Sequence, residues 1–406
     1  MDGAEKWGNS PRGSGLPKRA VPHVLDKGRD GEIMAQRITK IAGIVALTTV
    51  LVSAVAGAAD VKGLTKELFA VPSTTGNEDA LAAKIRGLLP KGLAFETDGL
   101  GTLAVRLSGA AGPTLLIAAL DGYGHMVSGI TSEGYLTLDR PVAAPHIRFD
   151  AFLLGQPVVV STAKGPVAGV ISQPALHLLT PERRRTLVDG FSLENAFVDI
   201  GVRSEKEARA KGVEILDAVT YPAVLTELAG DQWAGPDLGL KAVAAALVSV
   251  VGDLATRGAG EETVVAWAAQ TKFAARGRGA RPAVGAARAR SKWQPRRTVA
   301  VGLIAAGKGD GFPFPGGGPV LIQPKDAATP LRQAFEKAAA AAGIPLQYMT
   351  ADDSSLALPF AAPPSEVITL ALPVRFLNTP SEVVEAKDLQ ALCDLLRRFV
   401  EPGGAK

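Results

Sequence analysis

The chain has 406 residues, 47% of them hydrophobic and 21% charged, so it can bury a large core and is not a disordered, highly charged protein. Its 44 Lys and Arg exceed its 40 Asp and Glu by too little to indicate a nucleic-acid-binding protein, and no nucleic-acid partner is expected. The single cysteine, Cys393, excludes an internal disulfide framework and any Cys-rich zinc or iron–sulfur site. The length predicts two or three domains.

The N-terminal part of the sequence falls into two segments. Residues 1–33 show no hydrophobic periodicity and predict a disordered extension upstream of a translation start at Met34. Residues 34–59 combine a basic start, an uncharged apolar run and a small-residue triplet, which are the parts of a secretory signal peptide. We expect export to the periplasm or the extracellular space, with no stable membrane span after cleavage. The alternative is a membrane anchor formed by residues 41–59.

The first predicted elements of the mature chain are an amphipathic helix over 77–88 and strands over 103–107 and 114–120. The second strand is apolar on both faces, which indicates a buried position in a sheet. Short segments with alternating apolar residues follow and are typical of an antiparallel β unit: 134–138, 157–161, 167–171 and 196–200. Residues 127–228 are therefore expected to form an inserted β domain.

Helices and buried strands alternate again after residue 237. Helices are predicted over 240–251, 331–342 and 387–400, and strands over 263–269, 298–304 and 366–372. This alternation predicts a three-layer α/β domain built discontinuously from residues 60–126 and 229–402.

Candidate chemical groups are few when the residues are considered alone. His125 lies near Asp121, His146 lies in a Pro-rich stretch, and His177 lies between two leucines. None of them is spaced from another His or Cys as a pair of metal ligands would be. A lone histidine is more often a hydrogen-bonded structural residue than a ligand.

Three aspartates can be interpreted either as functional residues or as structural ones. Asp352 and Asp353 precede two serines, an arrangement that would suit either chemistry or a helix N-cap. Asp237 follows Gly235-Pro236 and precedes a helix, so locally it is most simply an N-cap. The glycine triplet 316–318 lacks the Lys-Ser/Thr of a phosphate-binding loop and indicates a turn.

A basic segment without acidic residues occupies 276–297. It is either a solvated surface or a contact for a polyanion or a membrane surface. Its charged members are Arg276, Arg278, Arg281, Arg288, Arg290, Lys292, Arg296 and Arg297.

Four stretches, taken in order, resemble the glutamyl-aminopeptidase or tetrahedral-aminopeptidase family of two-metal exopeptidases over about residues 61–399. LLGQPVVV (153–160) is similar to the family's LPGQxVxI, and ISQPALHLLTPE (171–182) to its G..PPHLLxxEE. FVDIG with SEKEA (197–208) is similar to YIDIGAxSxEEA, and LPVRFLNTPSEVV (372–384) to IPTRYxHSPxEVV. The resemblance implies a zinc-exopeptidase-like α/β domain with an inserted antiparallel β-barrel.

The same resemblance locates the active-site positions of the family in this chain. Members bind two zinc or cobalt ions through five ligands and activate water with a glutamate. Aligning AHMDE with AALDG (118–122) gives Ala119 in place of the first ligand histidine and retains Asp121. The other family-equivalent positions are Asp237, the only retained ligand, Thr271 for the catalytic glutamate, and Lys272, Gly302 and Asn378 for the remaining ligands.

These substitutions imply a catalytically inactive, exported homologue with a binding or assembly role, for which we expect no cofactor and no catalytic residue. The implied partners are a peptide ligand and further copies of the chain. Lys272 is expected to form a salt bridge with Asp237, because an unpaired buried carboxylate is unfavourable. The alternative is a metallo-aminopeptidase or other peptide hydrolase with a rebuilt metal site, formed by His125, Asp121, Asp237, Asp352 and Asp353.

Overall fold

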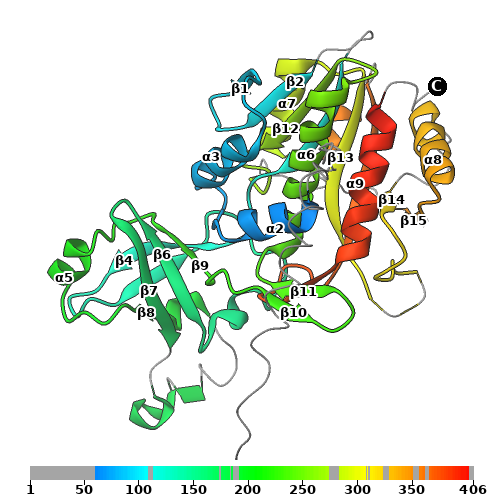
Figure 1. The fold of residues 1–406 in the computed structure, drawn as a ribbon. Coiled ribbons are helices and arrows are strands. Elements are labelled where there is room, and N and C mark those ends of the chain that lie inside the picture. The colour runs from blue at the N-terminus through cyan, green and yellow to red at the C-terminus, as the bar shows by residue number, and fades with distance from the viewer. Residues whose placement is uncertain are drawn as a thin grey trace, which may run out of the picture. The chain divides into compact units, whose positions relative to one another are not determined.

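A central β-sheet organises the chain in this computed structural model, whose ribbon is drawn in Figure 1. The structure describes residues 60–107, 113–172, 175–182, 184–185, 192–273, 283–307, 309, 311–322, 329–350, 356–361 and 365–401. All of them belong to one compact unit, Ala56–Lys406. The predicted extension and signal segment, residues 1–59, lie outside the described residues.

The helices are α2 (Val61–Phe69), α3 (Asp79–Leu88), α5 (Glu205–Ala210), α6 (Leu238–Arg257), α7 (Val284–Trp293), α8 (Pro330–Ala342) and α9 (Ala386–Val400). The strands of the sheet are β1 (Phe95–Thr97), β2 (Leu103–Leu107), β3 (Thr114–Ala119), β10 (Thr226–Leu228), β11 (Gln232–Gly235), β12 (Thr263–Ala268), β13 (Arg297–Ala305), β14 (Val320–Ile322), β15 (Gln347–Met349), β16 (Glu366–Arg375) and β17 (Glu382–Glu385). The predicted helices and strands of the α/β part all occur, with α6 extending six residues beyond the predicted 240–251 at its C-terminal end.

The sheet, as far as the structure describes it, has the order β1-β2-β12-β3-β13-β16-β17-β11-β10, with β14 and β15 branching from β16. Its centre, β12-β3-β13-β16, is parallel. Ala119 at the end of β3 is level with Ala268 at the end of β12, and Ile117 is level with Ala300 of β13. The carboxyl ends of these strands therefore meet at one edge, where open α/β sheets bind ligands.

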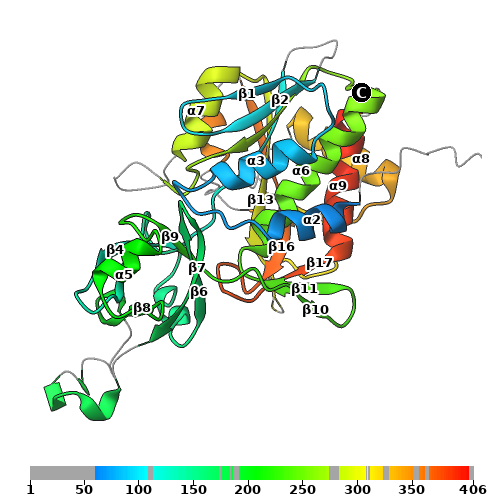
Figure 2. The same cartoon turned by 60° about the vertical axis from the view of Figure 1, so that its left-hand side comes forward.

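Helices cover both faces of this sheet, as the alternation of buried residues along β3 shows. Leu116 and Ala118 belong to the large core that contains α2, α3, α6 and α9. Leu115 and Ile117 face the other way and pack in a second core with Trp293 of α7 and Phe360. Figure 2 shows α2, α3, α6 and α9 gathered on one side of the strands. The predicted three-layer α/β architecture is confirmed.

Helix α6 lies in the middle of the larger core. Within the described residues it is the one helix long and apolar enough to cross a membrane, but 89% of its most apolar window is buried inside the protein. Tight packing against α2, α9 and the sheet explains its composition, rich in Ala, Val and Leu. It is a core helix.

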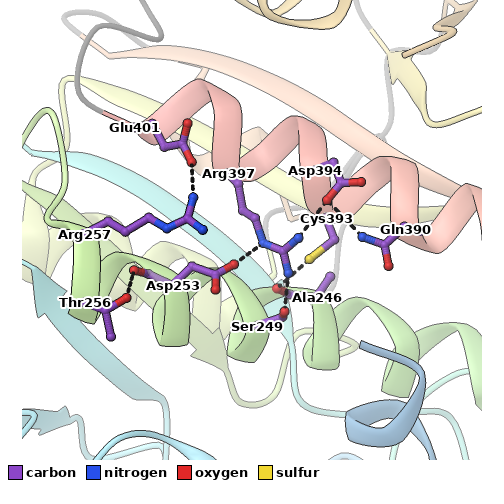
Figure 3. A network of polar contacts seen from close by, with 10 residues as sticks. All are labelled: Ala246, Ser249, Asp253, Thr256, Arg257, Gln390, Cys393, Asp394, Arg397 and Glu401. Atoms are coloured by element: carbon purple, nitrogen blue, oxygen red, sulfur yellow. Dashed lines mark hydrogen bonds and ion pairs between the residues drawn. The ribbon is translucent and has the colours of Figure 1, made fainter. Parts of the chain in front are cut away.

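A buried polar network joins α6 to α9 (Figure 3). The guanidinium of Arg397 forms an ion pair with Asp253 and donates hydrogen bonds to Ser249 and to Asp394. Arg397 and Asp253 are each 8% exposed, so the pair is shielded from water on both sides. Cys393 lies one turn earlier and its thiol donates to the Ala246 carbonyl at 3.7 Å.

The inserted part forms a closed β-barrel (Figure 2) with the strand order β4-β5-β8-β7-β6-β9. Its strands are β4 (His125–Ile130), β5 (Leu136–Asp139), β6 (Pro157–Thr162), β7 (Gly165–Ser172), β8 (Phe197–Asp199) and β9 (Ala218–Thr220). Inward residues such as Val127, Val158 and Val198 fill it with an apolar core. The β-barrel predicted from the resemblance is confirmed.

Candidate functional site

Five of the seven family-equivalent positions line one cavity of about 300 Å³ at the carboxyl edge of the parallel strands. They are Ala119, Thr271, Lys272, Gly302 and Asn378. Ala119 ends β3, Gly302 lies on β13, Thr271 and Lys272 follow β12, and Asn378 lies in the turn between β16 and β17. Ala119 and Gly302, 183 positions apart along the chain, are thus brought together by the parallel register of β3 and β13.

Asp121 holds the loop after β12 in place. It is fully buried, and its Oδ1 accepts hydrogen bonds from the backbone N–H of Thr271 at 2.8 Å and from the Thr271 hydroxyl at 2.6 Å. Its Oδ2 accepts from the Lys272 N–H at 2.9 Å and from the Thr75 hydroxyl at 2.8 Å. With four donors on two oxygens, this carboxylate has a complete structural role and little capacity left for a metal.

Asp237 begins α6 beside the cavity, in the left-handed conformation at φ 51°. It occupies the N-cap position, as the local sequence predicts, but its side chain makes no capping hydrogen bond. It faces a separate small cavity of about 20 Å³, shared with Tyr123, Tyr221 and Asn378. A Cβ atom built on Gly122 would lie 2.9 Å from the Asp237 carboxylate, so the absence of a side chain at Gly122 makes room for this acid.

The nearest cationic group in the helix is Lys241, one turn after Asp237. It is 2% exposed, and its Nζ has no hydrogen-bond partner among the described residues. Burial lowers the pKa of Lys241 to about 8, against the favourable charge of Asp237. Burial raises the pKa of Asp237, and Lys241 and Lys272 partly offset that rise. A carboxylate in this position is therefore stabilised by two lysines.

Glu382 is a member of this cluster to which the sequence analysis gave no role, although it lies within the LPVRFLNTPSEVV motif. Its two oxygens accept the backbone N–H groups of Asn378 and Gly239, each at 2.9 Å. Burial raises its pKa, and the charge of Asp237 adds to the rise. Lys241 was also missed, but the four-residue spacing from Asp237 on one helix could have indicated it.

Lys272 does not form the expected salt bridge with Asp237. Its Nζ lies 5.4 Å from the centre of the Tyr123 ring, in a cation–π contact, and no carboxylate of the described residues lies within ion-pair distance of it. The backbone N–H of Lys272 is bound to Asp121, and the side chain lines the cavity beside Tyr123 instead of pairing with Asp237. The charge of Lys272 still acts on Asp237 over a longer distance.

The described residues of the rebuilt-site alternative are not brought together around an open position. His125 is buried, its Nε2 lies 3.1 Å from Asp150, and its ring stacks on Phe149. Asp121 is saturated as described above, and Asp352 and Asp353 lie outside the described residues. Within the part that is described, no three His, Cys, Asp or Glu side chains are grouped as metal ligands.

The other two candidate histidines, His146 and His177, lie outside the lining of the cavity. His146 contacts the Asn378 carbonyl through Nε2 at 3.2 Å and thereby links the inserted part to the site loop. His177 lies in an exposed 3₁₀ turn, Leu176–Leu178.

The basic segment is partly engaged in internal contacts. Lys292 pairs with Glu96, and Arg297 pairs with Glu261, both across the sheet edge. Arg288 and Arg296 are exposed, whereas Arg276, Arg278 and Arg281 lie outside the described residues. Arg290 is half-buried on α7.

Comparison with known proteins identifies the family. Residues 101–395 match the M42 glutamyl aminopeptidase family. The chain belongs to this family. A lysyl aminopeptidase of Pyrococcus furiosus is 25% identical over 352 residues, covering 83% of this chain and 96% of the relative.

Solved structures show the same M42-type fold. A TET aminopeptidase of the Thaumarchaeota archaeon SCGC AB-539-E09 superposes with a TM-score of 0.71 at 22% identity, covering 84% of this chain and 96% of the other. The Pyrococcus horikoshii TET1 peptidase, described as assembling into a tetrahedron or a large octahedral shell, gives 0.70 at 23% identity, covering 83% and 98%.

Membership of the M42 family corrects one expectation. No cofactor was expected from the aligned ligand positions, but the chain belongs to a family of metal-dependent aminopeptidases, for which zinc or cobalt is the implied cofactor. The expectation was wrong because it was drawn from aligned ligand positions, whereas the family relationship extends over most of the chain.

The donors at the site nevertheless fit such a pair of ions poorly. Ala119 and Gly302 offer no donor atom, the Thr271 hydroxyl is already bound to Asp121, and Lys272 contributes a cation. Each Glu382 oxygen accepts one backbone N–H group, and Glu382 is not among the described residues that line the cavity. Two dications held close together need several anionic ligands, and the described site supplies one, Asp237.

Proposed function

We propose that this M42 chain is a non-hydrolytic member of its family whose cleft binds a ligand without cleaving it. The proposal depends on one observation: the cavity formed by the family-equivalent positions contains a lysine and no carboxylate among its described lining residues. Peptide hydrolysis by the family's chemistry needs a base to activate water and a positive centre to polarise the carbonyl, held by acidic ligands. Thr271, where the base is expected, is hydrogen-bonded to Asp121 and cannot act as one.

The test is an activity assay of the purified mature chain on leucine, lysine and glutamate p-nitroanilides with added zinc or cobalt. We expect no turnover above that of an Asp237→Asn variant. The Pyrococcus furiosus lysyl aminopeptidase, assayed in parallel, provides the positive control. Turnover that depends on cobalt and disappears in Asp237→Asn would overturn the proposal and favour the rebuilt-site hydrolase.

We also infer that the chain forms homo-oligomers. The inference is supported by the solved relatives, one described as a dodecamer and another as a tetrahedron or an octahedral shell. Light scattering coupled to size-exclusion chromatography tests it. A monomer at all accessible concentrations would contradict it.

Export of the mature chain is a further part of the proposal. It is supported by the basic start, apolar run and small-residue triplet of residues 34–59. Mass spectrometry of the N-terminus of the native protein would reveal cleavage after Ala58. A native peptide covering residues 2–12 would contradict both the start at Met34 and the cleavage.

A further inference from the structure

The cavity of about 300 Å³ at the carboxyl edge of the sheet has apolar walls. Helix α6 contributes Leu240 and Val243, and β13 contributes Val301, Leu303 and Ile304. Leu356 and Leu377 continue the wall. This volume lies at the lower end of the roughly 300–1,000 Å³ typical of small-molecule pockets, so it suits a compact ligand better than an extended peptide.

Lys272 is the one charged side chain among the described residues that line this cavity. Its Nζ has neither an ion pair nor a hydrogen bond with the described residues and lies over the face of Tyr123, 5.4 Å from the ring centre. Its charge acts on Asp237 and Glu382 only at longer range. A half-buried ammonium among apolar walls favours an anionic partner, because a charge-assisted hydrogen bond is stronger where water is partly excluded.

The other polar groups of the lining cannot substitute for an acid. The Thr271 hydroxyl donates to Asp121, so toward the cavity it can only accept. The remaining polar side chains, Tyr123, Thr369 and Asn378, supply a phenol, a hydroxyl and an amide. Asp237 and Glu382 are not among the residues that line this cavity. A ligand bearing a free ammonium group would therefore place it near Lys272 with no carboxylate among the described lining residues to pair with it.

From this arrangement we infer that the cavity binds compact apolar molecules that carry a carboxylate and no free amino group, with Lys272 as the partner of the carboxylate. This inference rests on the proposed non-hydrolytic function and specifies its ligand. Two sources share the chemistry, N-acylated hydrophobic amino acids and short fatty acids. The cavity therefore prefers an anionic group, whereas a free peptide N-terminus carries a positive charge.

Three ligands separate the charge states: N-acetyl-leucine and N-acetyl-leucinamide, which are of equal size and differ in charge, and leucinamide, which lacks the acetyl group and carries an ammonium. Isothermal titration calorimetry on the full mature chain should show binding of N-acetyl-leucine, roughly 10- to 100-fold weaker binding of the neutral amide, and no detectable binding of leucinamide. Octanoate serves as the fatty-acid arm. Tighter binding of octanoate than of N-acetyl-leucine would identify a fatty acid, and the opposite order an N-acyl amino acid.

Two variants and one control test whether the ligand binds in this cavity. Lys272→Met should reduce N-acetyl-leucine affinity to that of the neutral amide. Gly302→Leu should abolish binding by filling the cavity, since a Cβ at Gly302 meets only Thr369 Cγ2, at 3.8 Å. Thermal melting of this variant checks that it is folded. Lys84→Met, which removes an exposed lysine on α3, should leave binding unchanged.

The inference is overturned if no carboxylate binds, if leucinamide binds as well as N-acetyl-leucine, or if Lys272→Met leaves affinity unchanged while thermal melting shows a folded protein. Failure of the proposed function is a separate result. It would appear as p-nitroanilide turnover, whereas N-acetyl-leucine has no amino-terminal residue for an aminopeptidase to remove and reports on binding alone.

Discussion

Lys241 lies one helical turn after Asp237 at the start of α6, and its buried ammonium has no hydrogen-bond partner among the described residues. The two side chains are nonetheless coupled by charge: Asp237 is the group that opposes the lowering of the Lys241 pKa by burial. Such a pair need not stabilise the fold, but removing one member leaves the other uncompensated.

We therefore expect Asp237→Asn to lower the free energy of unfolding by about 3–5 kcal/mol, because it leaves Lys241 buried without a nearby anion. Adding Lys241→Met should recover most of this loss, since an unbranched apolar side chain fits the space of the lysine stem. Urea unfolding of the single and double variants gives the coupling energy.

The matched control is the surface pair Lys84–Glu67, in which Lys84 Nζ lies 2.7 Å from Glu67 Oε2. Its coupling should stay below about 1 kcal/mol because water screens it. Equal coupling in the two cycles would show that Asp237 and Lys241 do not interact in the way the structure indicates.

Arg397 offers a second test, of the contact between α6 and α9 (Figure 3). Arg397→Met removes the partner of the buried Asp253 and should destabilise the protein by about 3–5 kcal/mol. The adjacent Arg398 is exposed and pairs with Glu401 at 3.7 Å, so Arg398→Met should change stability by less than about 0.5 kcal/mol. Thermal and chemical unfolding measure both. Similar effects of the two substitutions would contradict the assigned role of Arg397.

Cys393 provides a pH-dependent prediction. Burial raises the pKa of its thiol to about 11 from the ordinary value of 9.0. Between these pH values the folded chain binds more protons than the unfolded chain, so this group's contribution to stability is complete below pH 9 and is lost as the pH rises through 11. The loss amounts to roughly 3 kcal/mol.

The measurement compares wild type with Cys393→Ala in urea at pH 8, 9.5 and 11. The wild type should lose more stability across this range than the variant does. Iodoacetamide should also fail to modify the folded wild type at pH 8.5 and react once urea unfolds it. Rapid modification without urea would show that the thiol is accessible.

Hydrophobic pattern predicted the core of the fold because it reports burial directly. The strands β3, β12, β13 and β16 are apolar on both faces, and α9 has one apolar stripe. Both patterns can be recognised in the sequence. The strands β11, β14 and β17, of three or four residues, were missed, whereas β5 and β8 of similar length were predicted as parts of the alternating segments 134–138 and 196–200. The α2 helix was also missed, although Val61, Thr65, Leu68 and Phe69 place its buried side chains at helical spacing.

The site was accessible to sequence reasoning only through the resemblance to the family. Composition and spacing alone assigned Asp237 to a helix cap, whereas its left-handed backbone turns the carboxylate toward Gly122 and a small cavity. The direction of Lys272 could not be predicted either, because it is set by a hydrogen bond from its backbone to Asp121, 151 residues away. Such contacts depend on the register of β3 against β12.

Gly122 and Gly302 both have a backbone conformation that any residue can adopt, but Gly122 lies against Asp237 and Gly302 does not. In Gly122→Ala the new Cβ would lie 2.9 Å from the Asp237 carboxylate, and we expect a loss of about 1–3 kcal/mol from overpacking. At Gly302 the new Cβ meets only a methyl group, 3.8 Å away. Gly302→Ala should therefore be neutral or stabilise by about 0.4–1 kcal/mol, because alanine restricts the unfolded chain. Urea unfolding measures both, and in an Asp237→Ala background the cost of Gly122→Ala should disappear. A cost that persists there would mean that another neighbour of Gly122, and not Asp237, requires the glycine.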